Sequence, residues 1–373
     1  MDRRTFLQLG VGAQVGGGIL WGSRDRRQRF ALSPPGYSVI PVVADGRWIW
    51  DKPPEGQTGY LEPRPFELKV GIELEGTGGA TALAASTPVP VECPEQKIHE
   101  ARLETHGCVA QVQVLAPFAR QLLLRAPGIA PGQRIAAYAH YKLTLYKQYQ
   151  GYGREQFPAE QKVPREVGRA YTGNSPGIHT RTPEVRELME QLTKELVHPW
   201  DKARAFASWI PKNIEVKRGR YVGVPRCIEK RHGDCEDMSA LLVALCRAAG
   251  IPARLVWVPN HNWVEFYLED TEGKGHWIPA HVSAYSWWGW TGAHELVLQK
   301  GDRIYVPQQH KHYRLQEDWM QWQGRRPRVK YVAELAPMAK DTGSDPGPGA
   351  REKIASGEWK LAGGHPLDRI ARR

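Results

Sequence analysis

Cysteine is scarce in this sequence of 373 residues, which has five, at positions 93, 108, 227, 235 and 246. An odd count excludes complete pairing into disulfides and leaves at least one thiol as a candidate reactive group. Cys93 and Cys108 lie in the same part of the chain and could pair. A reactive thiol is therefore the first chemical group to seek.

Long apolar runs are also missing. A helix needs about 18 or more consecutive apolar residues to cross a bilayer, and no such run occurs outside the N-terminus. The body of the chain is therefore predicted not to span a membrane. With 41% hydrophobic residues and 14 tryptophans, a chain of this length can form two domains with substantial cores.

The sequence has no tight cluster of Lys and Arg interleaved with aromatic residues, so no nucleic-acid partner is expected. The net charge is +11, of which six arginines against Asp2 and Asp25 place +4 in the first 33 residues, leaving +7 on the rest. This surplus is compatible with an anionic partner such as a cell wall or membrane surface. The simpler interpretation is a solvated basic surface.

The N-terminus has the pattern of an export signal. Arg3 and Arg4 are followed by Phe6, Leu7 and a short Gly-rich apolar run to Trp21, and a charged start before an apolar segment is typical of targeting sequences. Residues 1–33 resemble a twin-arginine signal, which implies export of the folded protein to the periplasm or the exterior. The membrane would be contacted only through this segment, which would act as an anchor if it were not cleaved.

An antiparallel β domain is predicted within 34–165, together with a linker. Apolar residues alternate with period two at Phe66, Leu68, Val70, Ile72 and Leu74, which indicates a strand with one buried face. The pattern repeats at the following positions: Val112, Val114, Ala139, Tyr141, Leu143 and Leu145. Several such strands separated by turns favour a β-sandwich.

The apolar period changes to that of helices in the second domain, predicted over 166–335. Thr182 before Pro183 is a good helix start, and another helix is expected near Asp201. Strand patterns follow, so this domain is of the α+β class. Residues 336–373 are rich in Gly, Pro and charge and are predicted to be a flexible tail.

The most informative segment surrounds Cys235. Asp234 is a predicted helix N-cap, and Asp237 is placed to complete a capping box. Cys235 then lies in the first turn, where the helix dipole lowers a thiol pKa and the amides could stabilise an oxyanion. Because Asp234, Glu236 and Asp237 raise that pKa, a basic partner is needed. Cys246, three turns further along, is expected to be a buried core thiol.

His261 is the predicted basic partner. It opens a run rich in aromatic and β-branched residues, and a polar loop separates this run from a second strand that ends near His281. In a hairpin centred near Thr271, His261 and His281 would lie opposite one another.

This segment resembles the core of the transglutaminase-like superfamily in several consecutive motifs. These are Gly233-Asp234-Cys235-x-Asp237, Ala240-Leu241, the run from Cys246 to Arg254, His261-x-Trp263 and Trp277-x-Pro279. The resemblance implies a papain-like fold, in which Cys235 attacks an amide carbonyl and His261 takes and returns the proton. It also implies a third residue that orients His261. The expected architecture is thus α+β, a papain-like transglutaminase core preceded by a β-sandwich-like domain.

His281 departs from the family pattern, which usually has Asp at that position. A neutral His281 can fix the tautomer of His261 but supplies no negative charge. Asp270 and Glu265 are other candidates for the orienting role. Cys235, His261 and His281 could alternatively form a zinc site with an open fourth position.

The sequence therefore predicts an exported cysteine enzyme that acts on amide or peptide bonds and uses no cofactor. A protein or peptide, including cell-wall peptide, is the expected substrate, and the sequence leaves hydrolysis and acyl transfer to an amine open. The main alternative is a binding module whose altered site does not turn over. Six of the 14 tryptophans lie between 257 and 290, as core residues or as walls of a binding cleft.

Overall fold

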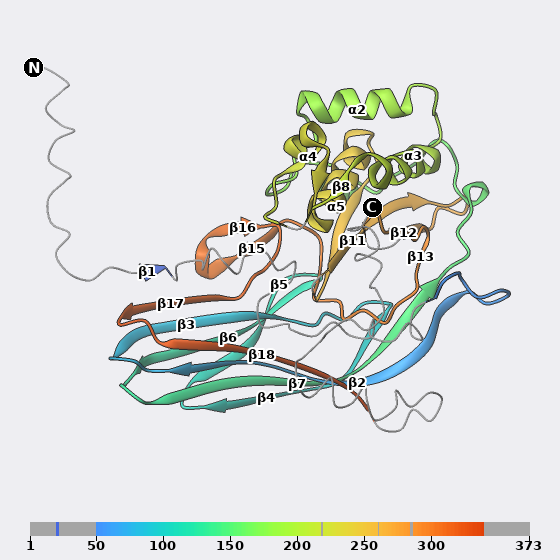
Figure 1. Ribbon diagram of the computed structural model, residues 1–373. Coiled ribbons are helices and arrows are strands. Elements are labelled where there is room, and N and C mark those ends of the chain that lie inside the picture. The colour runs from blue at the N-terminus through green and yellow to red at the C-terminus, as the bar shows by residue number, and fades with distance from the viewer. Residues whose placement is uncertain (1–19, 22–49, 218, 260, 284–285, 339–373) are drawn as a thin grey trace, which may run out of the picture.

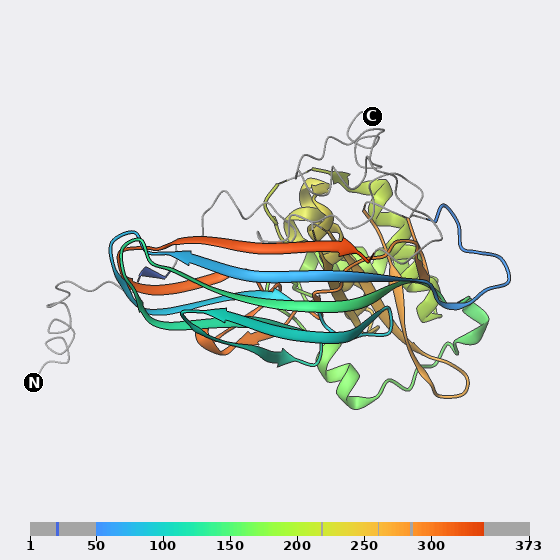
Figure 2. The ribbon, with the colours of Figure 1, turned by 90° about the horizontal axis from the view of Figure 1, so that it is seen from below.

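A β-sandwich and a helical layer divide the molecule, as Figure 1 shows for the computed structural model. The structure describes residues 20–21, 50–217, 219–259, 261–283 and 286–338. Long strands form the sandwich, and Figure 2 shows its strands running roughly side by side toward the helical part. Most of the helices lie together above the sandwich in the view of Figure 1.

One sheet of the sandwich has the order β13-β7-β2-β18, with β4 also paired to β7. Its strands are β2 (Gly59–Glu75), β4 (Gln96–His106), β7 (Arg134–Tyr149), β13 (Trp290–Thr291) and β18 (Arg328–Pro337). The alternating residues from Phe66 to Leu74 are each 2% exposed or less. The predicted buried face of this strand is therefore confirmed.

The second sheet has the order β1-β17-β3-β6-β14-β10-β11-β12, with β5 also paired to β6. Its strands are β1 (Leu20–Trp21), β3 (Ala80–Val89), β5 (Val109–Ala116), β6 (Ala119–Ile129), β10 (Ala253–Val258), β11 (His261–Glu269), β12 (Gly275–Ala280), β14 (Gln299–Lys300) and β17 (Trp319–Gly324). Strand β14 joins β6 of the sandwich to β10 of the second domain. One hydrogen-bonded sheet therefore connects the two domains.

The helical layer contains α1 (Arg165–Tyr171), α2 (Pro183–Thr193), α3 (Pro199–Asn213), α4 (Val224–Lys230) and α5 (Cys235–Ala248). Helix α2 begins after Thr182 with proline at its first turn, as predicted, and α3 begins two residues before Asp201. All residues of α5 from Asp237 to Arg247 are buried. This helix is therefore the centre of the second core.

Short elements complete the second domain. They are the strands β8 (Glu215–Val216), β9 (His232–Gly233), β15 (Ile304–Val306) and β16 (Lys311–Tyr313), with 3-10 turns at Arg154–Gln156 and Pro307–Gln309. The parallel pair β8–β9 precedes α5 directly. Among the described residues, no helix is long and apolar enough to cross a membrane.

Three expectations need correction. The chain returns to the sandwich before residue 335, because β17 pairs with β3 and β18 with β2. The valines of β5 alternate as predicted, but Val112 and Val114 are 41% and 63% exposed, since β5 lies at the edge of the sheet. Cys93 and Cys108 do not pair, and all five cysteines are thiols.

The predicted export segment 1–33 and the predicted tail 336–373 lie outside the described residues, apart from residues 20–21 and 336–338.

Candidate active site

The start of α5 is fixed by the predicted capping box. The Asp234 carboxyl accepts hydrogen bonds from the amides of Glu236 and Asp237, at 2.9 and 3.1 Å, and the Asp237 carboxyl accepts from the Asp234 amide. A Cβ atom at Gly233 would come within 2.5 Å of the Asp237 Cβ, so the turn requires glycine there. Cys235 is the first residue of the helix and is 6% exposed.

Asp237 also joins the start of α5 to the preceding loop. Its second carboxyl oxygen accepts hydrogen bonds from the amides of Val222 and Gly223, at 2.9 and 3.0 Å. The backbone on both sides of Cys235 is thereby held by one buried carboxylate. A rigid backbone around a nucleophile keeps the sulfur in one position.

The electrostatic surroundings of Cys235 oppose a thiolate. Burial raises the pKa of its thiol well above the usual value, and the charges of Asp234 and Glu236 raise it further, while hydrogen bonds from the helix amides lower it. Burial and the neighbouring Asp237 also raise the pKa of Asp234 to about 8. The predicted need for a basic partner follows directly, because the helix terminus alone does not ionise this thiol.

Glu236, next to the nucleophile, is paired with Arg314. The Arg314 guanidinium donates to one Glu236 carboxyl oxygen, with its Nε at 2.6 Å, and lies 3.7 Å from the ring centre of Tyr221. Burial raises the pKa of Glu236, and the charge of Arg314 acts in the opposite direction. No local pattern predicts this pair, because 78 residues separate its members.

Helix α5 brings Cys235 to the end of β11 that carries His261. The helix ends shortly before β10, whose first residue Ala253 pairs with Phe266, so the C-terminus of α5 lies beside the middle of β11. Ser239, one turn after Cys235, lies 3.5 Å from the Asn262 carbonyl. Cys235 precedes Ser239 by about one helical turn, or about 6 Å along the helix. It therefore lies further toward the end of β11 that carries His261.

His261 and His281 are brought together, although in a different register from the one predicted. The hairpin of β11 and β12 pairs Val264 with Ala280. In this register the position of His281 is opposite Trp263 and not opposite His261. The rings of His261 and His281 are nevertheless 5.8 Å apart between centroids, with their planes at 26°. At this separation the two nearly parallel imidazoles lie beside one another without direct face contact.

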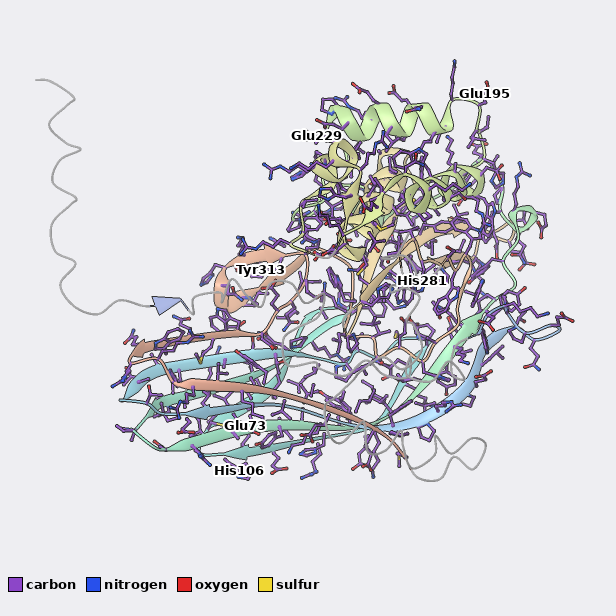
Figure 3. The ribbon with its side chains drawn as sticks, in the orientation of Figure 1. Glu73, His106, Glu195, Glu229, His281 and Tyr313 are labelled. Carbon is purple, nitrogen blue, oxygen red and sulfur yellow. The ribbon has the colours of Figure 1, made fainter. Side chains whose placement is uncertain are left out.

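Two tryptophans enclose His281. Trp263 is nearly parallel to its ring at 5.3 Å, and Trp287 meets it edge-on at 4.8 Å. Burial and the charge of His261 lower the pKa of His281 well below the usual value, so this ring is neutral near pH 7. Figure 3 places His281 where the helical part meets the sandwich, far from Glu73 and His106.

The other candidates for the orienting residue are engaged elsewhere. Glu265 pairs with Arg254 and Lys300, each at 2.6 Å, and Asp270 accepts from His276 at 2.6 Å within the hairpin loop. Of the three orienting candidates, His281 is thus the one whose ring lies beside that of His261.

The zinc alternative is not supported. Cys235, His261 and His281 are all described, and no group of three or more His, Cys, Asp or Glu side chains in the described part of the chain could hold a metal ion. Cys246 is a fully buried core thiol, as predicted.

The tryptophans between 257 and 290 serve mainly in packing. Trp257, Trp263 and Trp287 are buried, and Trp288 packs on Phe266. Trp277 lines a cavity of about 630 Å³ between the two domains.

A thiol at the start of a buried helix, with a histidine on a neighbouring strand, fits a papain-like fold. Residues 186–282 match the model of the transglutaminase-like superfamily. The matched range contains Cys235, His261 and His281.

Two curated proteins are similar to parts of this chain. The uncharacterized protein YebA of Bacillus subtilis is 27% identical over 112 residues, 28% of this chain and 15% of that protein. A peptide-N(4)-(N-acetyl-beta-glucosaminyl)asparagine amidase of Yarrowia lipolytica is 29% identical over 76 residues, 20% of each chain. The matches therefore span a fifth or less of these relatives.

A solved structure shares the fold over most of the chain. The "Putative Cysteine Protease" of Cytophaga hutchinsonii has a TM-score of 0.53 at 16% identity, and the match covers 76% of this chain and 94% of that one. This extent includes residues outside the superfamily match, so the shared fold is larger than the transglutaminase-like domain.

Proposed function

We propose that the protein is an exported cysteine-dependent enzyme that hydrolyses amide or peptide bonds through an acyl-thioester on Cys235. The observation that carries this proposal is the placement of Cys235, where α5 begins, at the end of β11 that holds His261, whose ring centroid lies 5.8 Å from that of His281. The amidase and protease names of two relatives are consistent with hydrolysis.

The first half of the reaction transfers the acyl group to sulfur. His261 takes the proton of the Cys235 thiol, and the thiolate attacks the carbonyl carbon of the substrate. The Asp234 carboxyl uses the amides of Glu236 and Asp237, so the Cys235 amide is the first-turn donor left to an oxyanion. His261 then gives its proton to the leaving amine as the carbon–nitrogen bond breaks.

The second half releases the product. Water gives a proton to His261 and attacks the thioester, and the proton returns to the Cys235 sulfur as the carboxylic acid product departs. If an amine replaced water, the same site would form a new amide bond. We propose water as the acceptor, and mass analysis of products formed with and without an added primary amine tests that choice.

His281 acts as the orienting residue in this scheme. Since its ring is neutral, a nitrogen lone pair can accept a hydrogen bond from the His261 N–H and hold the tautomer that the base requires. It adds no negative charge, so the imidazolium of His261 is stabilised less than in a site with a carboxylate.

A binding module without turnover is the second candidate. It is favoured by the same His281, which replaces the carboxylate usual in this family, and by the burial of Cys235. In that case the fold would hold a peptide without cleaving it.

The decisive experiment is the pH dependence of Cys235 alkylation by iodoacetamide in the full chain, read by peptide mass spectrometry. Cys108, half-buried in the sandwich with a pKa raised by burial, is an internal control. We expect fast labelling of Cys235 at about pH 6, slowed in His261→Ala, with Cys108 unchanged. Labelling of Cys235 that begins only above about pH 8.5 and ignores His261 would exclude the dyad.

A further inference from the structure

A second cavity, of about 690 Å³, lies between the sandwich and the transglutaminase-like domain. The turn between β5 and β6 contributes Pro117 and Phe118 to its wall, α1 contributes Arg165 and Arg169, and the loop after β14 contributes Arg303. Cys235, His261 and His281 are not among its lining residues. The cavity is therefore separate from the site of the proposed chemistry.

Three exposed arginines give this cavity its charge. In the described part of the chain, none of Arg165, Arg169 and Arg303 makes a hydrogen bond or ion pair with another residue. Glu166 is the one exposed carboxylate in the lining. Three positive charges against one negative charge leave +2.

The other charged groups of the lining are already neutralised. Lys300 is buried and paired with Glu95 and Glu265 at 2.5 and 2.6 Å, and Asp302 is paired with Arg247 at 2.8 Å. With Arg254, which also pairs with Glu265, these groups carry three positive and three negative charges. Arg165, Arg169 and Arg303 are therefore the charged groups available to a ligand.

We propose that this cavity binds an acidic segment of a peptide, one or two of whose carboxylates pair with Arg165, Arg169 and Arg303. Guanidinium groups bind carboxylates through paired N–H donors. A surplus of +2 suits one or two carboxylates bound at a time. The apolar surfaces of Pro117 and Phe118 can cover the carbon atoms of the same segment.

The position of the cavity connects it to the proposed hydrolysis, on which this inference rests. Lys300, in the cavity wall, holds Glu265, which shares a face of β11 with His261 four residues away. At the rise of a strand, four residues span about 13 Å. Lys300 thus joins the cavity lining to the strand that carries His261, which puts the cavity within reach of an extended substrate bound at the proposed site.

Binding can be measured without turnover. We would titrate full-length Cys235→Ala protein against a fluorescein-labelled hexaglutamate peptide by fluorescence anisotropy, with hexaglutamine and polyphosphate as comparison probes. We expect hexaglutamate to bind at least tenfold tighter than hexaglutamine and tighter than polyphosphate. Binding should weaken with added salt, because the contacts are charged and partly exposed.

Charge-removing variants locate the site. Arg303→Gln and the double variant Arg165→Gln/Arg169→Gln should each weaken hexaglutamate binding about tenfold. Arg226→Gln is the matched control, since Arg226 is exposed on α4 and does not line the cavity. Equal affinity for both hexapeptides, preference for polyphosphate, or equal loss in Arg226→Gln would overturn the proposal.

The two proposals fail separately. Loss of the hexaglutamate preference, with normal pH-dependent alkylation of Cys235, would remove the acidic-peptide site and leave the hydrolase. Arginine-dependent peptide binding without a reactive Cys235 would leave a peptide-binding protein.

Discussion

The ring of His281 lies 5.8 Å from the ring of His261, between centroids, at the position where a transglutaminase-like site usually has a carboxylate. Burial and the charge of His261 lower the pKa of His281, so the His281 ring is neutral near pH 7. The pair can therefore serve as base and orienting group, with a weaker bias toward the ion pair than a carboxylate would give.

Replacing His281 by aspartate should make Cys235 more reactive at low pH. A carboxylate beside His261 stabilises the imidazolium and with it the thiolate, so the midpoint of Cys235 alkylation should fall by about one pH unit or more in His281→Asp. Rates of iodoacetamide labelling across the pH range measure this.

His281→Ala is the control, in which the orienting group is lost without a new charge, and its midpoint should not fall. Slower labelling of His281→Asp than of the unaltered protein at every pH would mean that the imidazole itself is required.

Removing Arg314 should make Cys235 less reactive. Arg314→Met leaves the Glu236 carboxylate, which is largely buried, without its cation beside the thiol, and we expect the alkylation midpoint to rise by about one pH unit. Adding Glu236→Gln removes the carboxylate and should return the midpoint to its original value. A midpoint that stays raised in the double variant would point to a change in the loop that holds Tyr221.

The buried pair of Arg247 and Asp302 should dominate local stability. Both side chains are 2% exposed or less, and Arg247→Met would leave an unpaired buried carboxylate, at a cost of about 3–5 kcal/mol in the free energy of unfolding. Urea unfolding measures this cost.

The double variant Arg247→Met/Asp302→Asn should recover part of it, because no buried charge remains. Lys52→Met breaks an exposed pair with Glu55 and should change stability by less than about 1 kcal/mol. Equal effects of the buried and exposed substitutions would contradict the burial of the Arg247 pair.

His294 should make the protein less stable in mild acid. Burial lowers its pKa from 6.5 to about 4, so between these values the unfolded chain binds a proton that the folded protein does not. Stability from this group is therefore complete above pH 6.5 and is lost as pH falls toward 4, up to roughly 3 kcal/mol.

Unfolding free energies at pH 7 and at about pH 4.5, compared between the unaltered protein and His294→Gln, isolate this contribution. The variant should lose less stability on acidification. An identical loss in both proteins would assign the acid sensitivity to other groups.

Local features could be predicted from the sequence because their energies come from neighbours along the chain. The capping box of Asp234 and Asp237 joins residues three positions apart, and the buried face of β2 follows from strict alternation. The first turn of α5 with Cys235 was therefore determined by the sequence alone.

Only the tertiary structure decided the contacts between distant segments. Arg314 reaches Glu236 across 78 residues, the hairpin register moves His281 opposite Trp263, and β18 returns to pair with β2. Such pairings depend on which surfaces are buried together and on the entropy of closing long loops, neither of which has a signature in local spacing. The sequence by itself thus determined the helix that begins at Cys235, whereas the packed fold determined the environment of its thiol.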